Sequence, residues 1–335
     1  MKVLAGDIGG TNTRLVLAEF DGESLNVYAQ KNYYSNDYSG LQEVITGFFS
    51  EFYFSGTVDA ACFAVAGPVK SGTASITNLP WVVSAEQLKT DLDIPHIILL
   101  NDFVAVAYGI AELDDDNTRI LQHGNSEEDF PVPVDAAIIG AGTGLGVAHR
   151  KWIEDHYQVF SSEAGHVGFA PENQQQLELL GWLLKQHQHV SQEMVLSGKG
   201  LARIYRFLHE VHNFKQSSVI EQAMQETDPA RAITEFARSH DDELCQRALD
   251  CFTDIYGAAA GNVALHYYPL AEIYIAGGIA PKILDTRLSQ RFIKAFVNKG
   301  QMSSNLEQVR VKLIESEHTG LYGALARLKD LNKTF

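Results

Sequence analysis

The sequence has few cysteines and no long apolar run. Its 335 residues include three cysteines, which form no CxxC pair. Neither a disulfide framework nor a structural metal site is therefore indicated, and a reducing compartment is expected. No uncharged apolar run approaches the length that spans a membrane, and the start MKVLAGD is too short for a signal-peptide core. We expect a cytoplasmic protein with no membrane partner.

Basic residues are also scarce. Lysine and arginine number 26 against 42 acidic residues, which gives a formal net charge of −16. A field of this sign repels nucleic acid and anionic lipid, so neither is an expected partner. A small phosphate ligand remains compatible with it, because backbone amides and a bound cation can reverse the local field.

No low-complexity segment and no linker rich in proline or serine interrupts the chain. A length of 335 residues with 45% hydrophobic residues exceeds one ordinary core, so two domains or a second lobe are expected. Short apolar runs at 2–5, 13–20 and 25–33 predict an antiparallel meander, and the alternating helix and strand patterns that follow predict an α/β lobe with a mixed sheet.

Element order and glycine placement predict that the second half of the chain repeats the plan of the first. A new strand and glycine series starts at 136–140 and continues to 160, and residues 172–266 carry helical patterns. Strands are predicted at 273–276 and 309–314, and a last helix at 321–331. The predicted lobes are residues 1–112 with 316–335, and 113–315 with a helical elaboration.

A glycine turn follows the first predicted strand. Such a turn between strands presents successive backbone N–H groups to an anion, and glycine permits the close approach. Asp7 would repel phosphate directly and makes sense if Mg²⁺ lies between them. A plain hairpin capped by aspartate explains the turn equally well on this evidence. The candidate nucleotide ligands are Asp7, Gly9, Gly10, Thr11 and Asn12.

Two further glycine clusters strengthen the phosphate interpretation. Residues 141–146 repeat the order strand, glycine turn, strand in the second half, and two matched turns imply a cleft between two related lobes. A third cluster ends a strand before a helix; it either lies under a purine ring or merely caps the strand. Neither a P-loop nor a dinucleotide fingerprint is present. The candidates here are Gly142, Thr143, Gly144, Gly277 and Gly278.

Asn101 and Asp102 end the apolar strand IILL and begin a helix. A carboxylate at a strand end can accept a proton from an alcohol, and a neighbouring amide can pair with sugar hydroxyls. Asp102 can equally be the N-cap of the helix, and local sequence favours the cap. Both roles are compatible.

In these residues the chain resembles the nucleotide-binding superfamily of actin, the 70-kDa heat-shock chaperones and the sugar kinases. Over its whole length it resembles the ATP-dependent bacterial glucokinases of the enterobacterial type. The supporting strings are GDIGGTNTR, TNLPW, NDFVAVAYG, GAGTGLGVAH, SEAGHVGFAP, VLSGKGL and IAGGI. The resemblance implies a two-lobed, actin-like (ribonuclease H-like) α/β fold with mixed five-stranded sheets.

The resemblance also implies roles for individual residues. Asp102 becomes the general base for the 6-hydroxyl of D-glucose, ATP the phosphoryl donor, and Asp7 a water-mediated ligand of Mg²⁺. The implied sugar ligands are Asn78, Asn101, Asp102, Glu163, His166 and Glu193. The family's usual Gly-Glu-Gly-Gly-His loop reads Ser-Glu-Ala-Gly-His at 162–166, which leaves the dihedral angles of this loop open. A homodimer is implied as well.

Two other functions remain as alternatives. A sugar-responsive regulator would need a DNA-binding extension, which the strand at residue 2 and the negative charge disfavour. An actin-type ATPase would lack the sugar ligands. Within the kinase class, the preference among hexoses and the choice among ATP, ADP and polyphosphate stay open.

Overall fold

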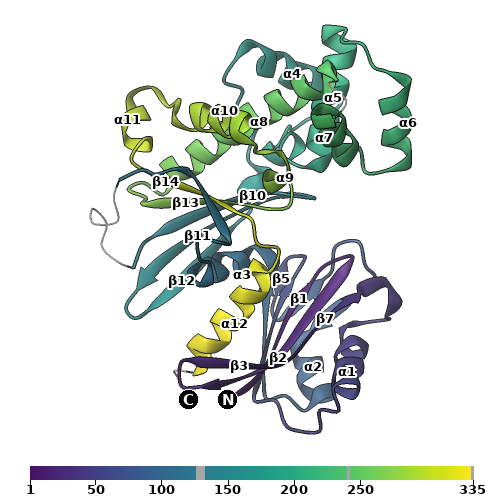
Figure 1. The fold of residues 1–335 in the computed structure, drawn as a ribbon, viewed down its shortest axis with the longest axis vertical. Coiled ribbons are helices and arrows are strands. Elements are labelled where there is room, and N and C mark those ends of the chain that lie inside the picture. Colours follow the sequence, from purple (N-terminus) through teal and green to yellow (C-terminus); the bar gives the residue numbers. More distant parts are fainter. Residues whose placement is uncertain (126–132, 240–241, 333–335) are drawn as a thin grey trace. The chain divides into compact units, whose positions relative to one another are not determined.

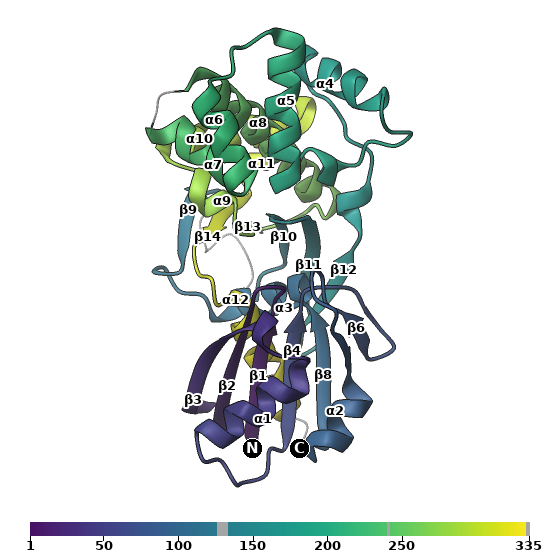
Figure 2. The same ribbon diagram turned by 90° about the vertical axis from the view of Figure 1, so that its right-hand side faces the viewer.

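The computed structural model describes residues 1–125, 133–239 and 242–332. The chain divides into two compact units, and each is described by itself (Figures 1 and 2). Unit 1 comprises Met1–Asp114, Ile153–Val159 and Ser316–Phe335, and unit 2 comprises Asp115–Trp152 and Phe160–Glu315. The predicted lobe boundaries stay a prediction about the domain organisation.

Unit 1 is built on a mixed sheet with the strand order β3-β2-β1-β4-β8. β1 to β3 form the predicted antiparallel meander, and β4 and β8 run parallel to β1. The meander prediction is thus confirmed. The strands are β1 (Lys2–Ile8), β2 (Asn12–Asp21), β3 (Ser24–Tyr34), β4 (Ala60–Val65) and β8 (His96–Asn101).

Helices cover both faces of this sheet because its central strands are apolar on both sides. Val3 and Ala5 of β1 pack in the cluster that contains α12, whereas Leu4 and Ile8 pack in the cluster that contains α1 and α2. Figure 1 shows α12 on one side of the sheet and α1 and α2 on the other. The other elements of unit 1 are α1 (Leu41–Glu51), α2 (Ala85–Leu92), α3 (Asp102–Gly109), α12 (Thr319–Asn332) and a small sheet of β5 (Val69–Lys70), β6 (Thr73–Ser75) and β7 (Val82–Ser84).

Unit 2 repeats this plan, as predicted. Its sheet has the order β12-β11-β10-β13-β14-β9, in which β10 pairs antiparallel with β11 and parallel with β13. The prediction of five strands is wrong for this sheet, because β9 adds a sixth strand, antiparallel to β14, within the described residues. The strands are β9 (Thr118–Gln122), β10 (Ala136–Ala141), β11 (Leu145–Ile153), β12 (His156–Ser162), β13 (Glu272–Ala276) and β14 (Arg310–Ile314).

Most helices of unit 2 gather on one side of its sheet (Figure 2), around the buried α8. An ideal Cβ on Gly257 of α8 would lie 2.2 Å from the carbonyl oxygen of Phe292 in α10, so only glycine allows this contact. The helices are α4 (Gln174–Leu184), α5 (Gly198–His212), α6 (Ser218–Glu226), α7 (Pro229–Ser239), α8 (Glu243–His266), α9 (Ala280–Ile283), α10 (Thr286–Val297) and α11 (Ser303–Leu306). None of the described helices is both long and apolar enough to cross a bilayer.

Candidate active site

The carboxyl ends of three parallel strands form one edge of the unit 1 sheet. Ile8 of β1 is in register with Val65 of β4, and Val65 with Asn101 of β8. The first glycine turn, the chain after Val65, and the Asn101-Asp102 pair therefore leave the sheet side by side. Ligands of α/β sheets bind at such edges.

The first glycine turn has backbone donors to spare. The N–H of Gly9 closes the turn on the carbonyl oxygen of Asn12 at 2.8 Å, whereas the N–H groups of Gly10 and Thr11 donate to no described residue. An ideal Cβ on Gly10 would lie 2.6 Å from the carbonyl oxygen of Thr77, so this position requires glycine. The turn has the unpaired N–H groups that an anion needs.

Asp7 precedes this turn as a partly buried acid with a cationic neighbour. Arg14 Nη1 lies 3.4 Å from Asp7 Oδ2. Burial raises the pKa of Asp7, while Arg14 and His318 oppose that rise. A bound cation would also stabilise the ionised form of Asp7, and a carboxylate is a suitable ligand for Mg²⁺ through water. The described residues contain no cluster of three or more His, Cys, Asp or Glu side chains that could hold a metal ion.

The helix cap beside the predicted base belongs to Asn101. Asn101 Oδ1 accepts from the N–H groups of Phe103 at 3.0 Å and Val104 at 3.3 Å. Asp102 is the first residue of α3, so the interpretation of Asp102 as N-cap is corrected by one residue. The amide of Asn101 donates to Gly67 O and to Asp102 Oδ1, so its polar atoms are already engaged. Its role as a sugar ligand stays a prediction.

Asp102 is held through one oxygen only. Asp102 Oδ1 accepts from Phe103 N at 2.8 Å and from Asn101 Nδ2 at 2.9 Å, whereas no other described residue donates to Oδ2. Burial raises the pKa of Asp102 to about 6, and the nearby Asp7 adds to the rise against these hydrogen bonds. The Asp102 carboxylate is therefore fixed through Oδ1, its Oδ2 accepts from no other described residue, and its pKa is about 6.

Asn78 lies on an exposed turn of unit 1 near the first glycine turn. Its backbone adopts φ of 65°, in the left-handed region, which asparagine tolerates better than most residues. An ideal Cβ on Gly10 would lie 3.4 Å from Asn78 Cβ. The exposed Asn78 side chain is thus placed beside the predicted phosphate turn, which is compatible with a position at the rim of a ligand site.

The second glycine turn, in unit 2, resembles the first in its hydrogen bonds. Gly142 N donates to Gly144 O at 2.8 Å, and the N–H groups of Thr143 and Gly144 donate to no described residue. From the other side, the N–H of Gly198 at the start of α5 donates to Gly142 O at 2.9 Å. Spare N–H groups therefore occur in both predicted phosphate turns.

A buried tyrosine that sequence reasoning missed joins the second turn to the third. The Tyr256 hydroxyl of α8 accepts from Ala141 N at 3.0 Å and donates to Ala276 O at 3.1 Å. Gly277 has φ of 83°, and an ideal Cβ there would lie 2.4 Å from Ala141 O. The two turns are therefore packed backbone to backbone. A tyrosine in an apolar helix gives no sequence signal of this role.

Two of the three predicted sugar ligands in unit 2 are exposed, and the third, Glu193, is hydrogen-bonded to the backbone. The side chains of Glu163 and His166 are 84% and 64% exposed, with 3.9 Å between Oε2 and Nε2. Glu193 Oε2 instead accepts from Leu145 N at 3.0 Å. An ideal Cβ on Gly165 would lie 2.3 Å from Leu145 O, so the loop keeps glycine where space demands it. Ser162 and Ala164 have no positive φ, which answers the question about their dihedral angles.

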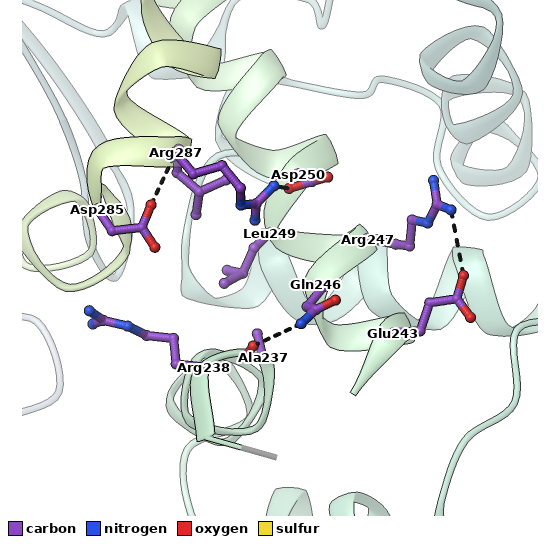
Figure 3. Close-up of a pocket in the computed structure, with 10 residues that line it drawn as sticks. Ala237, Arg238, Glu243, Gln246, Arg247, Leu249, Asp250, Asp285 and Arg287 are labelled. Carbon is purple, nitrogen blue, oxygen red and sulfur yellow. Dashed lines mark hydrogen bonds and ion pairs between the residues drawn. The ribbon is translucent and has the colours of Figure 1, made fainter. Parts of the chain in front are cut away.

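A separate pocket of about 620 Å³ lies among α7, α8 and α10 in unit 2 (Figure 3). Its arginines already have partners: Arg287 bonds Asp250 at 2.6 Å, Arg247 bonds Glu243, and Arg238 bonds a backbone carbonyl. It contains none of the predicted site residues. The paired charges make it a poor candidate for the reaction site.

The repeated sheet plan, the glycine turns and the acid at a strand end are features of two-domain α/β sugar kinases. In a crystal structure of glucokinase from an Antarctic psychrotroph, 99% of that chain aligns with 98% of this one, at 33% identity and a TM-score of 0.83. A glucokinase from Balamuthia mandrillaris, solved with glucose, is 21% identical, covers 97% of this chain and 93% of its own, and has a TM-score of 0.75. The second likeness concerns the fold alone.

The sequence comparison identifies the family. The family described as Glucokinase matches residues 4–331. A glucokinase from Nostoc sp. (strain PCC 7120 / SAG 25.82 / UTEX 2576) is 42% identical over 337 residues, covering 96% of this chain and 97% of that relative. The chain belongs to the glucokinase family and is an enzyme.

Proposed function

We propose that this protein transfers the γ-phosphoryl group of ATP to the 6-hydroxyl of D-glucose, the first step of glycolysis. The supporting observation is Asp102, a fixed carboxylate with a free oxygen and a pKa raised by burial to about 6. In the reaction the sugar oxygen bonds to the γ-phosphorus, the bond from that phosphorus to the β-γ bridging oxygen breaks, and Asp102 takes the hydroxyl proton. The products are glucose 6-phosphate and ADP.

The remaining sugar contacts in this proposal are those that the family resemblance implies. They are Asn78, Asn101, Glu163, His166 and Glu193. Carboxylates and an imidazole accept hydrogen bonds from hydroxyls, and one carboxylate can span two neighbouring hydroxyls. The high exposure of Glu163 and His166 keeps both side chains available to a ligand.

The proposed nucleotide contacts are mainly backbone donors. The turns at 9–12 and 142–144 offer N–H groups to the phosphates, and Gly277 and Gly278 would lie against the adenosine. Asp7 would hold Mg²⁺ through water, and that ion, when bound, neutralises charge on the phosphates. The Asp7 carboxylate is partly buried, and Arg14 only partly offsets the rise of its pKa, so a nearby cation would stabilise its ionised form.

The finer aspects of fold, assembly and location are part of the proposal. The strand order shared by the two sheets supports an actin-like, ribonuclease H-like class. A homodimer and a cytoplasmic location rest on the resemblance and on composition. Size-exclusion chromatography with light scattering tests the dimer directly.

An assay that couples ADP formation to NADH oxidation tests the function. We expect turnover with ATP and glucose and only slow hydrolysis without sugar. Hydrolysis regardless of sugar would favour the ATPase alternative, and glucose binding without turnover would favour a regulator. A panel that crosses glucose, mannose, glucosamine and fructose with ATP, ADP and polyphosphate defines the specificity.

A further inference from the structure

Glu193 occupies an unusual position for a sugar ligand, because one of its oxygens is bonded to a phosphate turn. Its Oε2 accepts from Leu145 N at 3.0 Å, and an ideal Cβ on Gly144 would lie 2.6 Å from the same oxygen. Gly144 is thus the residue that makes room for the carboxylate. No described residue donates to Oε1, which leaves that oxygen for another partner.

The surroundings of Glu193 fasten it to the same turn a second time. The Glu193 carbonyl oxygen accepts from Ser197 Oγ at 2.9 Å, and the next residue, Gly198, donates its N–H to Gly142 O at 2.9 Å. The segment 193–198 therefore holds the turn 142–145 at both ends. Through these hydrogen bonds, a shift of the Glu193 carboxylate would also move the N–H groups of that turn.

The other predicted sugar-ligand loop lies against the same residue, Leu145, but at its carbonyl oxygen. Gly165 lies so close to Leu145 O that an ideal Cβ would be 2.3 Å away. Glu163, two residues earlier, makes no hydrogen bond to the turn among the described residues, and its side chain is 84% exposed. The two glutamates thus share a proposed ligand but differ in their connection to the phosphate turn.

We infer that Glu193 is a positioning residue that couples sugar binding to nucleotide binding. This inference rests on the proposed function. A sugar hydroxyl bonded to Oε1 fixes the carboxylate, the carboxylate fixes the Leu145 N–H, and the spare N–H groups of the turn are presented in one arrangement to phosphate. By linkage, nucleotide must then strengthen glucose binding by the same factor.

Calorimetric titration of the Mg²⁺ complex of AMPPNP tests the inference, with and without saturating glucose. In the wild type we expect glucose to raise AMPPNP affinity at least about fivefold, the lower end of usual coupling. Glu193→Gln keeps the shape but weakens the bond to Leu145. The ratio of AMPPNP affinities with and without glucose should therefore fall toward one. Glu163→Gln is the matched control: it should need more glucose for saturation yet keep the wild-type ratio.

The outcomes separate this inference from the proposed function. A wild type that binds no glucose or no AMPPNP defeats the function itself. A wild type that binds both with a ratio of one, or a Glu193→Gln variant with the wild-type ratio, overturns the coupling alone. Equal loss of the ratio in Glu163→Gln also overturns it, because the bond to Leu145 would then be irrelevant. Circular dichroism of both variants confirms that they are folded.

Discussion

The two predicted phosphate turns of this protein are closed alike but supported differently. In each, the N–H of the first glycine bonds a carbonyl within the turn, at Asn12 O or at Gly144 O, and the following N–H groups donate to no described residue. The turn of unit 1 lies on the backbone of Thr77 and follows the partly buried Asp7. The turn of unit 2 is held by the side chain of Glu193.

This difference separates two ways of preparing a site. Unit 1 places acids where burial raises their pKa, so its contribution is proton affinity and charge. In unit 2, Glu163 is exposed, and the backbone packs closely around the glycines. Substitutions in unit 1 should therefore affect chemistry, and those in unit 2 should affect binding and the shape of the turns.

The largest effect is expected from Asp102→Asn. The amide keeps the shape and an acceptor for Phe103 N but cannot take the proton. We expect kcat to fall by about 10² to 10⁴, the usual contribution of a general base. Steady-state kinetics with the coupled assay measure this fall, and turnover close to wild type would rule out Asp102 as the base.

The same variant should be more stable at high pH. The pKa of Asp102 in the folded protein, about 6, lies above its ordinary value of 3.8, so the ionised group costs stability above pH 6. This cost is at most about 3 kcal/mol. Relative to wild type, Asp102→Asn should gain stability at pH 8 and lose that gain as the pH falls from 6 toward 4. Urea unfolding at both pH values provides the test.

Gly277→Ala should be the most damaging glycine change tested in unit 2. The positive φ and the backbone of Ala141 both oppose a side chain, and strain of this kind costs about 1–3 kcal/mol before any clash is added. Thermal melting and AMPPNP titration should both worsen. Gly278→Ala is the control for thermal melting, because an added Cβ meets no described atom within 4 Å. Equal losses of melting temperature in the two variants would contradict the packing argument.

Glu163→Gln should weaken glucose binding by about tenfold or more, because one hydroxyl contact loses its charge-assisted character. Its melting temperature should stay at the wild-type value, since the side chain is 84% exposed. Glucose titration and a thermal melt make both measurements. A fall in ATP affinity with unchanged glucose affinity would move this residue out of the sugar site.

Tyr256→Phe should raise KM for ATP about tenfold, because the Ala141 N–H and the Ala276 carbonyl lose a buried partner. KM for glucose should change little. Tyr205→Phe is a matched control: this tyrosine is also buried in unit 2, and its hydroxyl has no hydrogen-bond partner among the described residues. If the two variants shift KM for ATP equally, the hydroxyl bridge has no role in nucleotide binding.

The last test changes no residue and uses the pH profile of the wild type. Asp102 works as a base only when ionised, so kcat/KM for glucose should fall below about pH 6, tenfold for each pH unit. Rates between pH 5 and 8 measure the midpoint. An acid limb near pH 4 would mean that burial does not raise the pKa of the working base.

Much of the fold followed from local patterns. The meander of unit 1 and the parallel strands β4 and β8 were predictable because short apolar runs separated by turns are a strong signal. β9 was missed because TRILQ is short and half polar, and only pairing with β14 makes it a strand. A helix was expected after the third glycine cluster, and α9 begins there at Ala280.

The candidate site divides in the same way. Asp102 and the glycine turns stand out as residue types at strand ends, which a sequence reveals. The cap role fell to Asn101 because the side chain one position earlier can reach two N–H groups, a matter of backbone direction. Tyr256 was unpredictable, since its hydroxyl finds Ala141 only after α8 packs under the sheet.

The amino-acid sequence alone determined the class of structure, the family and the kinds of group available for phosphoryl transfer, because periodicity and short motifs are local properties. Only the tertiary structure decided which acid has a free oxygen and a raised pKa, and which is bonded to a phosphate turn. These properties depend on burial and on partners far apart in the chain, such as Leu145 with Glu193, and no local pattern contains them.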